Sequence, residues 1–118
     1  MDHFPYPTYL PTHRERWRLS QDELGELLGH KPGSGVISKY ENLTREPSVA
    51  ALVGSAFVFD VPARELFPAL YATVESMVTL RAIDLAEKIG DSADKKSLAK
   101  RALLESIARR AAGDASAV

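Results

Sequence analysis

Apolar positions along the chain recur three and four residues apart, and no stretch alternates between apolar and polar with a period of two. Clusters of Gly, Pro, Asn and Asp separate these segments. The pattern predicts an all-α fold, with five short helices followed by two C-terminal helices.

The first regular helix can begin at either of two places. Thr12 and Glu15 fit a capping box, and Pro11 also suits the first turn of a helix that starts one turn earlier. In both cases the helix should end near Arg18.

The second helix has a clearer start, because Ser20 and Glu23 have the spacing of a capping box. Gly29 should end it, since glycine tolerates the left-handed conformation found after a helix. The predicted buried stripe consists of Leu24, Leu27 and Leu28.

The segment His30–Gly35 contains Lys-Pro-Gly-Ser-Gly and is predicted to be a loop. A third helix follows, from about Ser34 to Asn42, with Ile37 and Tyr40 facing inward. A turn then leads to Pro47 and the fourth helix. That helix has an apolar stripe expected to face the core: Val49, Leu52, Val53, Ala56 and Phe57.

A short helix at about Ala63–Phe67 should close this part of the chain, and Pro68 begins a long helix that extends to about Ile89. One of its stripes contains Val74, Met77, Val78, Leu85 and Ile89, and Leu80 and Ile83 add a second apolar face. The last helix is predicted over about Asp94–Ala111, with apolar residues Leu98, Leu103, Leu104 and Ile107.

The predicted organisation has four parts. Residues 1–11 form an N-terminal arm that packs loosely, and residues 12–67 form a compact helical domain. Residues 68–111 form a C-terminal helical interaction region, and residues 112–118 form a flexible tail.

Composition narrows the class of protein. The 118 residues are 45 % hydrophobic and 26 % charged, as is ordinary for a globular protein. The absence of cysteine excludes disulfides and thiolate metal sites. No signal-peptide pattern is visible at the start, and no apolar run approaches the roughly 18 residues that span a bilayer. We therefore expect a cytoplasmic protein that does not enter a membrane.

Several residues match one known pattern in order and spacing. Residues 14–67 resemble the helix-turn-helix family of phage repressors, called XRE or Cro-like. The resemblance implies a five-helix, lambda-repressor-like domain that binds duplex DNA, with the third helix in the major groove. The matching residues are Arg14, Leu19 to Leu24, Leu28, Gly29, Val36 to Asn42, Arg45 to Pro47, Leu52, Phe57 and Glu65 to Phe67.

The resemblance also implies a role for each matching position. Gln21, at the start of the second helix, would contact a phosphate. Lys39 is the best candidate for reading a base, because an ammonium can donate to guanine O6 and N7. Arg14 and Glu41 would form a pair that connects the first and third helices. The implied DNA-binding residues are Gln21, Ser34, Gly35, Ser38, Lys39, Asn42 and Arg45.

Two features depart from the family pattern. The loop from His30 to Val36 is longer than in the tightest form of the family, and Arg18 stands where a glycine usually ends the first helix. Charge gives no general attraction to DNA, because residues up to Ser48 include six Lys or Arg and seven Asp or Glu. The alternative for Lys39 and Arg45 is that they are solvated surface charges.

Catalytic and metal sites are not predicted. His3, His13 and His30 lack the spacing of metal ligands, and no activated nucleophile is apparent. The Pro-Gly-Ser-Gly loop lacks the Gly-Lys-Ser/Thr ending of a phosphate-binding P-loop. We therefore expect no enzyme activity and no cofactor.

The C-terminal helices carry more apolar surface than a small domain can cover. A homodimer is the favoured explanation, and the alternative is that the last helix folds back and covers this surface within one chain. The overall prediction is a nucleoid-associated transcriptional regulator, a repressor that binds a palindromic operator as a homodimer. The alternative function is an antitoxin or adaptor that binds another protein through its C-terminal helices.

Overall fold

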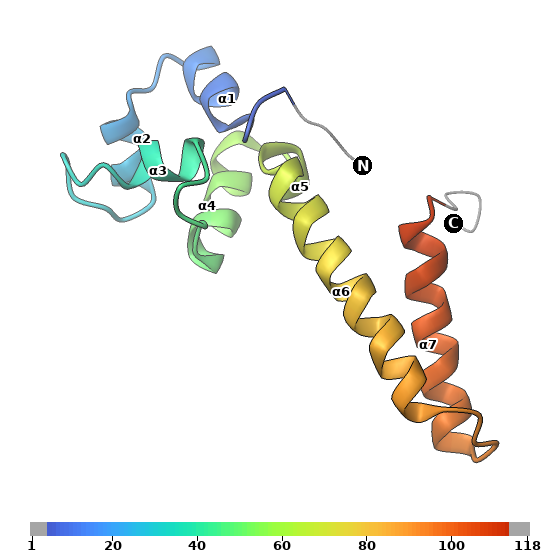
Figure 1. The fold of residues 1–118 in the computed structure, drawn as a ribbon. Helices are drawn as coiled ribbons and strands as arrows, with labels where there is room; N and C mark the ends of the chain where they lie inside the picture. The colour runs from blue at the N-terminus through green and yellow to red at the C-terminus, as the bar shows by residue number, and fades with distance from the viewer. Residues whose placement is uncertain (1–4, 114–118) are drawn as a thin grey trace. The chain divides into compact units, whose positions relative to one another are not determined.

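The computed structural model describes residues 5–113, which form seven α-helices and no β-strand (Figure 1). The all-α prediction is therefore confirmed for this part of the chain. The chain divides into two compact units, residues 1–71 and residues 72–118. The helices are α1 (Leu10–Arg16), α2 (Gln21–Leu27), α3 (Val36–Glu41), α4 (Val49–Phe59), α5 (Ala63–Leu66), α6 (Pro68–Ile89) and α7 (Lys95–Ala111).

The first unit has a core to which each of α1 to α5 contributes. Burying a large apolar side chain stabilises a fold by about 1.5–3 kcal/mol, so this cluster is the main support for the short helices α2 and α3. Its members are Leu10, Leu24, Ile37, Tyr40, Ala51, Phe59, Leu66 and Phe67.

Helix α1 begins at Leu10, with Pro11 in its first turn, so the earlier of the two predicted starts is confirmed. The predicted capping box at Thr12 is wrong. The residue before the helix is Tyr9, which provides no side-chain cap, and the Tyr9 backbone N–H donates instead to the Leu66 carbonyl at 2.8 Å. The start of α1 therefore has the predicted proline but is tied to the end of α5 by a backbone hydrogen bond and not by a side-chain cap.

The prediction of a loosely packed arm over residues 1–11 is wrong for its second half. Thr8 and Leu10 are only 3 % and 0 % exposed. Thr8 Oγ1 donates a hydrogen bond of 2.8 Å to the Glu41 carbonyl, which connects this segment to the end of α3. Residues 1–4 of the predicted arm lie outside the described residues.

Helix α2 has the predicted capping box. Ser20 Oγ accepts from the Glu23 backbone N–H at 3.0 Å, and Glu23 Oε1 accepts from the Ser20 backbone N–H at 2.8 Å. Gly29 has the expected left-handed conformation, with φ of +89°. The predicted stripe is partly wrong, because Leu27 is 60 % exposed. Gly25 is buried instead, beside Ile37 of α3.

The predicted inward face of α4 is also wrong. Val49, Val53 and Phe57 are 78 %, 64 % and 87 % exposed, and Leu52 and Ala56 are half-buried. The buried residues are Ala51, Ser55 and Phe59. Because α4 is apolar on nearly every side, its sequence does not indicate which side faces the core. Gly54 lets α4 lie close to the end of α2, because a Cβ there would be only 2.7 Å from Leu28 Cδ2.

The two C-terminal helices have the bounds that the sequence predicts. Asp94 caps α7 by accepting from the Ser97 backbone N–H at 3.0 Å. Helices α6 and α7 run in opposite directions and are joined by a short turn (Figure 1). Arg101 Nη1 donates to the Gly90 carbonyl at 2.8 Å, which ties α7 to the turn. No helix within residues 5–113 has the combination of length and apolarity needed to cross a bilayer.

Candidate functional site

The loop between α2 and α3 is held at its middle by a side chain of α2. Asp22 Oδ1 accepts from the Gly33 backbone N–H at 3.0 Å. Gly33 and Gly35 both have left-handed backbone conformations, with φ of +79° and +72°. These conformations cannot continue into a helix, so the loop stays irregular up to Gly35.

Helix α3 is consequently shorter than the sequence predicts, with six residues, Val36 to Glu41. Ser34 and Gly35 were expected on this helix but lie in the loop before it. Gly35 is the N-cap residue, and Ser34 Oγ accepts from the Val36 backbone N–H at 3.4 Å. Asn42, expected as the last helical residue, is the C-cap.

The side chains of α3 either pack into the core or face outward. Ile37, Tyr40 and Glu41 are buried, as expected for the first two. Val36 and Ser38 are half-buried, so Lys39 is the only exposed residue among the six of this helix. The structure therefore places the ammonium group of Lys39 alone on the outward side of α3.

The segment after α3 is folded back onto the end of that helix. The Lys39 carbonyl accepts from the backbone N–H groups of Thr44 and Arg45, at 3.1 Å and 3.4 Å. Asn42 Oδ1 accepts from the Thr44 backbone N–H at 3.0 Å and from Thr44 Oγ1 at 2.7 Å. Arg45 is exposed beside the end of α3, and Asn42 shapes the turn that puts it there.

A buried carboxylate connects three helices at the back of this site. Glu41 is 8 % exposed, and its Oε2 accepts from Arg14 Nε at 2.7 Å. Its Oε1 accepts from Gln21 Nε2 at 2.8 Å and from Arg14 Nη2 at 3.4 Å. Arg14 Nη1 also donates to the Leu19 carbonyl at 2.8 Å. This network fixes α3 relative to α1 and to the first residue of α2.

Gln21 therefore has a contact that the sequence did not indicate. It was expected to face a phosphate, but in the structure its side chain donates to Glu41. An amide nitrogen carries two N–H donors, so the bond to Glu41 leaves a second donor on the same group. Gln21 is exposed, and its position at the start of α2 is as predicted.

The seven predicted residues gather around one short helix, with Ser34 and Gly35 before it and Asn42 and Arg45 after it. Sequence reasoning missed Asp22 and Thr8, which hold the loop and the end of α3. Their partners are 11 and 33 residues away along the chain, so no local spacing could have revealed them.

The described histidines have roles in packing. The rings of His30 and Tyr40 lie 6.1 Å apart edge to face, and those of His13 and Phe59 lie 6.0 Å apart. Among residues 5–113, no three His, Asp or Glu side chains are grouped so that they could hold a metal ion. His3 lies outside these residues.

No protein-family model, no curated protein and no solved structure matches the chain.

Proposed function

We propose that the protein is a sequence-specific DNA-binding transcriptional regulator, a repressor that binds a palindromic operator as a homodimer. The observation that carries this proposal is the exposure of Lys39 alone on α3, while the rest of the helix is buried or half-buried. A rigid helix that presents one cation outward is suited to reading a base edge in the major groove.

In this proposal α3 lies in the major groove and Lys39 donates to O6 and N7 of a guanine. Ser38, half-buried beside it, would reach a neighbouring base or phosphate. Ser34 and Gly35 would approach DNA from the loop before the helix. Repression requires no chemistry, because the bound protein occupies the operator and blocks the promoter.

Phosphate contacts would surround this helix. Arg45 and Asn42 lie at its end, and the second amide donor of Gln21 points to a further contact at the start of α2. These contacts position the protein on the duplex and carry no sequence information. Few cations are involved and the unit has no excess positive charge, so we expect weak non-specific binding.

Selection of bound duplexes from a random DNA library tests the proposal. We expect an enriched inverted repeat whose half-sites lie about one helical turn, roughly 34 Å, apart. Fluorescence anisotropy with the selected duplex should then give an affinity far above that for a scrambled duplex. If selection enriches no sequence, the proposal is wrong. The proposal also predicts that the protein is found in the cytoplasm, associated with the nucleoid.

A second candidate function is that of an antitoxin or adaptor, and the apolar surface of α6 and α7 favours it. Eight large apolar side chains of these helices are 43–65 % exposed. For an antitoxin, co-expression should relieve the toxicity of a neighbouring gene product, and Leu103→Glu should abolish that relief. Toxicity that the wild type does not relieve would exclude this function.

A further inference from the structure

The second unit has almost no core of its own. Helices α6 and α7 have 22 and 17 residues, yet within residues 72–113 only Ala82 and Leu104 are buried among the hydrophobic residues. Large apolar side chains remain 43–65 % exposed on both helices. The alternative prediction, that α7 covers this surface within one chain, is therefore wrong.

Helical phase divides the exposed residues between the two sides of the α6–α7 hairpin. Ala82 and Leu104 are buried and mark the line along which the two helices meet. Each residue turns the helix by roughly 100°, so the phase of every other position follows from its distance to these two. Because α6 and α7 run in opposite directions, an equal sense of rotation on both helices leads to the same side of the hairpin (Figure 1).

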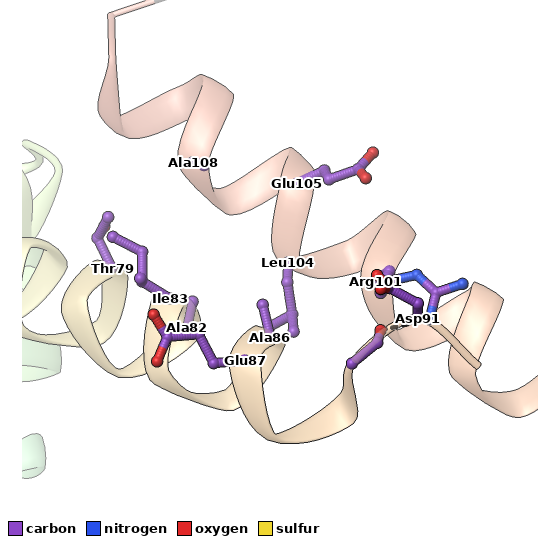
Figure 2. Close-up of a pocket in the computed structure, with 11 residues that line it drawn as sticks. Thr79, Ala82, Ile83, Ala86, Glu87, Asp91, Arg101, Leu104, Glu105 and Ala108 are labelled. Atoms are coloured by element: carbon purple, nitrogen blue, oxygen red, sulfur yellow. Dashed lines mark hydrogen bonds between the residues drawn. The ribbon is translucent and has the colours of Figure 1, made fainter.

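One side of the hairpin is an open acidic groove of about 570 Å³. Glu87, Asp91 and Glu105 line it together with Arg101 (Figure 2). Arg101 Nη1 already donates to the Gly90 carbonyl at 2.8 Å. Three carboxylates of the second unit therefore stand on this side.

The opposite side carries cations and large apolar side chains at the same helical phase. Five of its residues are Lys or Arg and none is Asp or Glu, because Asp84, the closest α6 carboxylate in phase, turns to the back of that helix. We call this side the basic apolar face. Its residues, paired by their distance from the turn, are Lys88 with Lys96, Leu85 with Lys100, Arg81 with Leu103, Val78 with Ile107, and Val74 with Arg110.

The cations of the basic apolar face have no acidic partner in the described part of the chain. All five are exposed, and none forms an ion pair within residues 5–113. The four Val and Leu side chains between them are 43–59 % exposed, and Ile107 is half-buried. Exposed apolar surface of this kind marks an interaction site. A complementary occupant has to supply apolar side chains and negative charge together.

Charge disfavours a second copy of the chain as that occupant. Two basic apolar faces in contact would bring five cations from each copy together. A copy that presented its acidic groove instead would form a heterologous contact, which leads to rings or filaments and not to a closed pair. A homodimer would therefore meet through another surface of the chain.

Two other polyanions fit the cations of the face but not its apolar residues. Phosphates of DNA would leave the aliphatic side chains without a partner. Helices that lie on anionic membranes keep their cations and apolar residues on separate faces and are rich in Trp and Phe. Here the two kinds of residue share one face, and residues 72–113 contain no aromatic side chain.

We propose that the basic apolar face binds an amphipathic helix of another protein, in which Asp and Glu flank a stripe of aliphatic residues. The bound helix would lie along the seam between α6 and α7 and complete a three-helix bundle. Its aliphatic stripe would pack on Leu85, Leu103, Val78 and Ile107, while its carboxylates meet the cations on either side. Because α7 has 17 residues, a partner helix of about 14–18 residues matches its length of about 26 Å.

The inference deepens the second candidate function, since it names the chemistry of the partner that an antitoxin or adaptor would hold. It rests on that function for its biological role. Binding of an acidic helix can nevertheless be measured without a toxin and without DNA.

Selection of helical peptides on the full chain tests the proposal. The probe is a displayed library of amphipathic peptides of about 18 residues, with aliphatic residues at i, i+3, i+4 and i+7 and with Glu, Gln or Lys at each flanking position. We expect strong enrichment of Glu at the flanks. Fluorescence anisotropy of a selected peptide should show binding that weakens at least about threefold when salt rises from about 0.1 M to about 0.5 M, because salt screens exposed charges.

Variants of α7 locate the binding surface. Lys96→Glu should weaken binding of the selected peptide about three- to tenfold, because it replaces an attraction with a repulsion. Lys95→Glu is the matched control, since it makes the same change of charge at an exposed position on the back of α7. Leu103→Glu should weaken binding about ten- to a hundredfold. Its control is Leu98→Glu, because Leu98 is similarly exposed (51 % against 59 %) but has the phase of the groove.

Both controls should bind the peptide as the wild type does, and circular dichroism should show that all four variants remain helical. Enrichment of Gln or Lys, no enrichment, or equal effects within either pair of variants would overturn the inference. A chain that binds acidic helices but relieves no toxicity would refute only the antitoxin role. Relief of toxicity that Leu103→Glu leaves intact would refute only this face.

Three further results would identify a different occupant and also overturn the inference. The first is binding to phosphatidylglycerol vesicles that Leu103→Glu abolishes, which would indicate a lipid surface. The second is self-association in sedimentation that Lys96→Glu abolishes, which would indicate a second copy. The third is an operator affinity that Lys96→Glu lowers and Lys95→Glu does not, which would indicate a DNA contact.

Discussion

Arg14 and Glu41 form an ion pair between α1 and α3, with Arg14 Nε 2.7 Å from Glu41 Oε2. Their side chains are only 11 % and 8 % exposed, and they stand 27 residues apart in the chain. The resemblance to the phage-repressor family implied this pair, and the contact is confirmed. A guanidinium that donates twice to one carboxylate fixes both the distance and the angle between the two helices.

Arg14→Ala should lower the free energy of unfolding by about 1–3 kcal/mol, because it leaves a buried carboxylate without its charged partner. Urea unfolding followed by circular dichroism measures this change. Arg16→Ala is the control, since Arg16 is exposed on the same helix and should change stability by no more than about 0.5 kcal/mol. Equal stability of the two variants would mean that the pair does not support the fold in solution.

Lys39→Ala should relax the base preference of the protein. If Lys39 reads a guanine, its removal should reduce binding by about 1–3 kcal/mol at one position of the operator and little elsewhere. Anisotropy titrations with a set of single-base operator variants measure this. Lys88→Ala, which removes a cation far along the chain, should preserve the preference. Equal weakening on every operator variant would identify Lys39 as a phosphate contact.

Gln21→Ala should weaken binding to all operator variants alike, because a phosphate contact carries no sequence information. The hydrogen bond to Glu41 adds a second effect, a loss of stability of about 1 kcal/mol. Affinities should therefore be measured well below the melting temperature of the variant. A changed base preference, with stability unchanged, would contradict both roles of Gln21.

Asp94 should make the start of α7 sensitive to acid. Hydrogen bonds from the Ser92 side chain, and then from the Ser97 backbone and side chain, lower the pKa of Asp94 from 3.8 to about 2. A pKa lowered by folding means that the stabilisation is complete above the ordinary value and is lost as the pH falls through about 2. NMR titration of the Ser97 amide should show this transition.

Asp94→Asn should remove that transition while largely preserving the cap, because an asparagine side chain also accepts from a backbone N–H. If the Ser97 amide titrates in the same way without the carboxylate, then another group is responsible for the change.

Local sequence was sufficient to determine most of the helices. The capping box of Ser20 and Glu23, the proline that opens α6 at Pro68 and the cap at Asp94 each act within a few residues of one another. The left-handed conformation of Gly29 is local in the same sense. Such signals depend on backbone geometry and on nearby side chains, so the chain specifies them before any tertiary contact forms.

Tertiary structure decided which faces are buried and how the site is assembled. Helix α4 is apolar on nearly every side, so only packing could select Ala51 and Ser55 for the core and leave Phe57 exposed. The contacts of Gln21 with Glu41 and of Asp22 with Gly33 join residues from different elements. Neither contact has a local spacing signal, because both depend on how two helices and a loop meet in space.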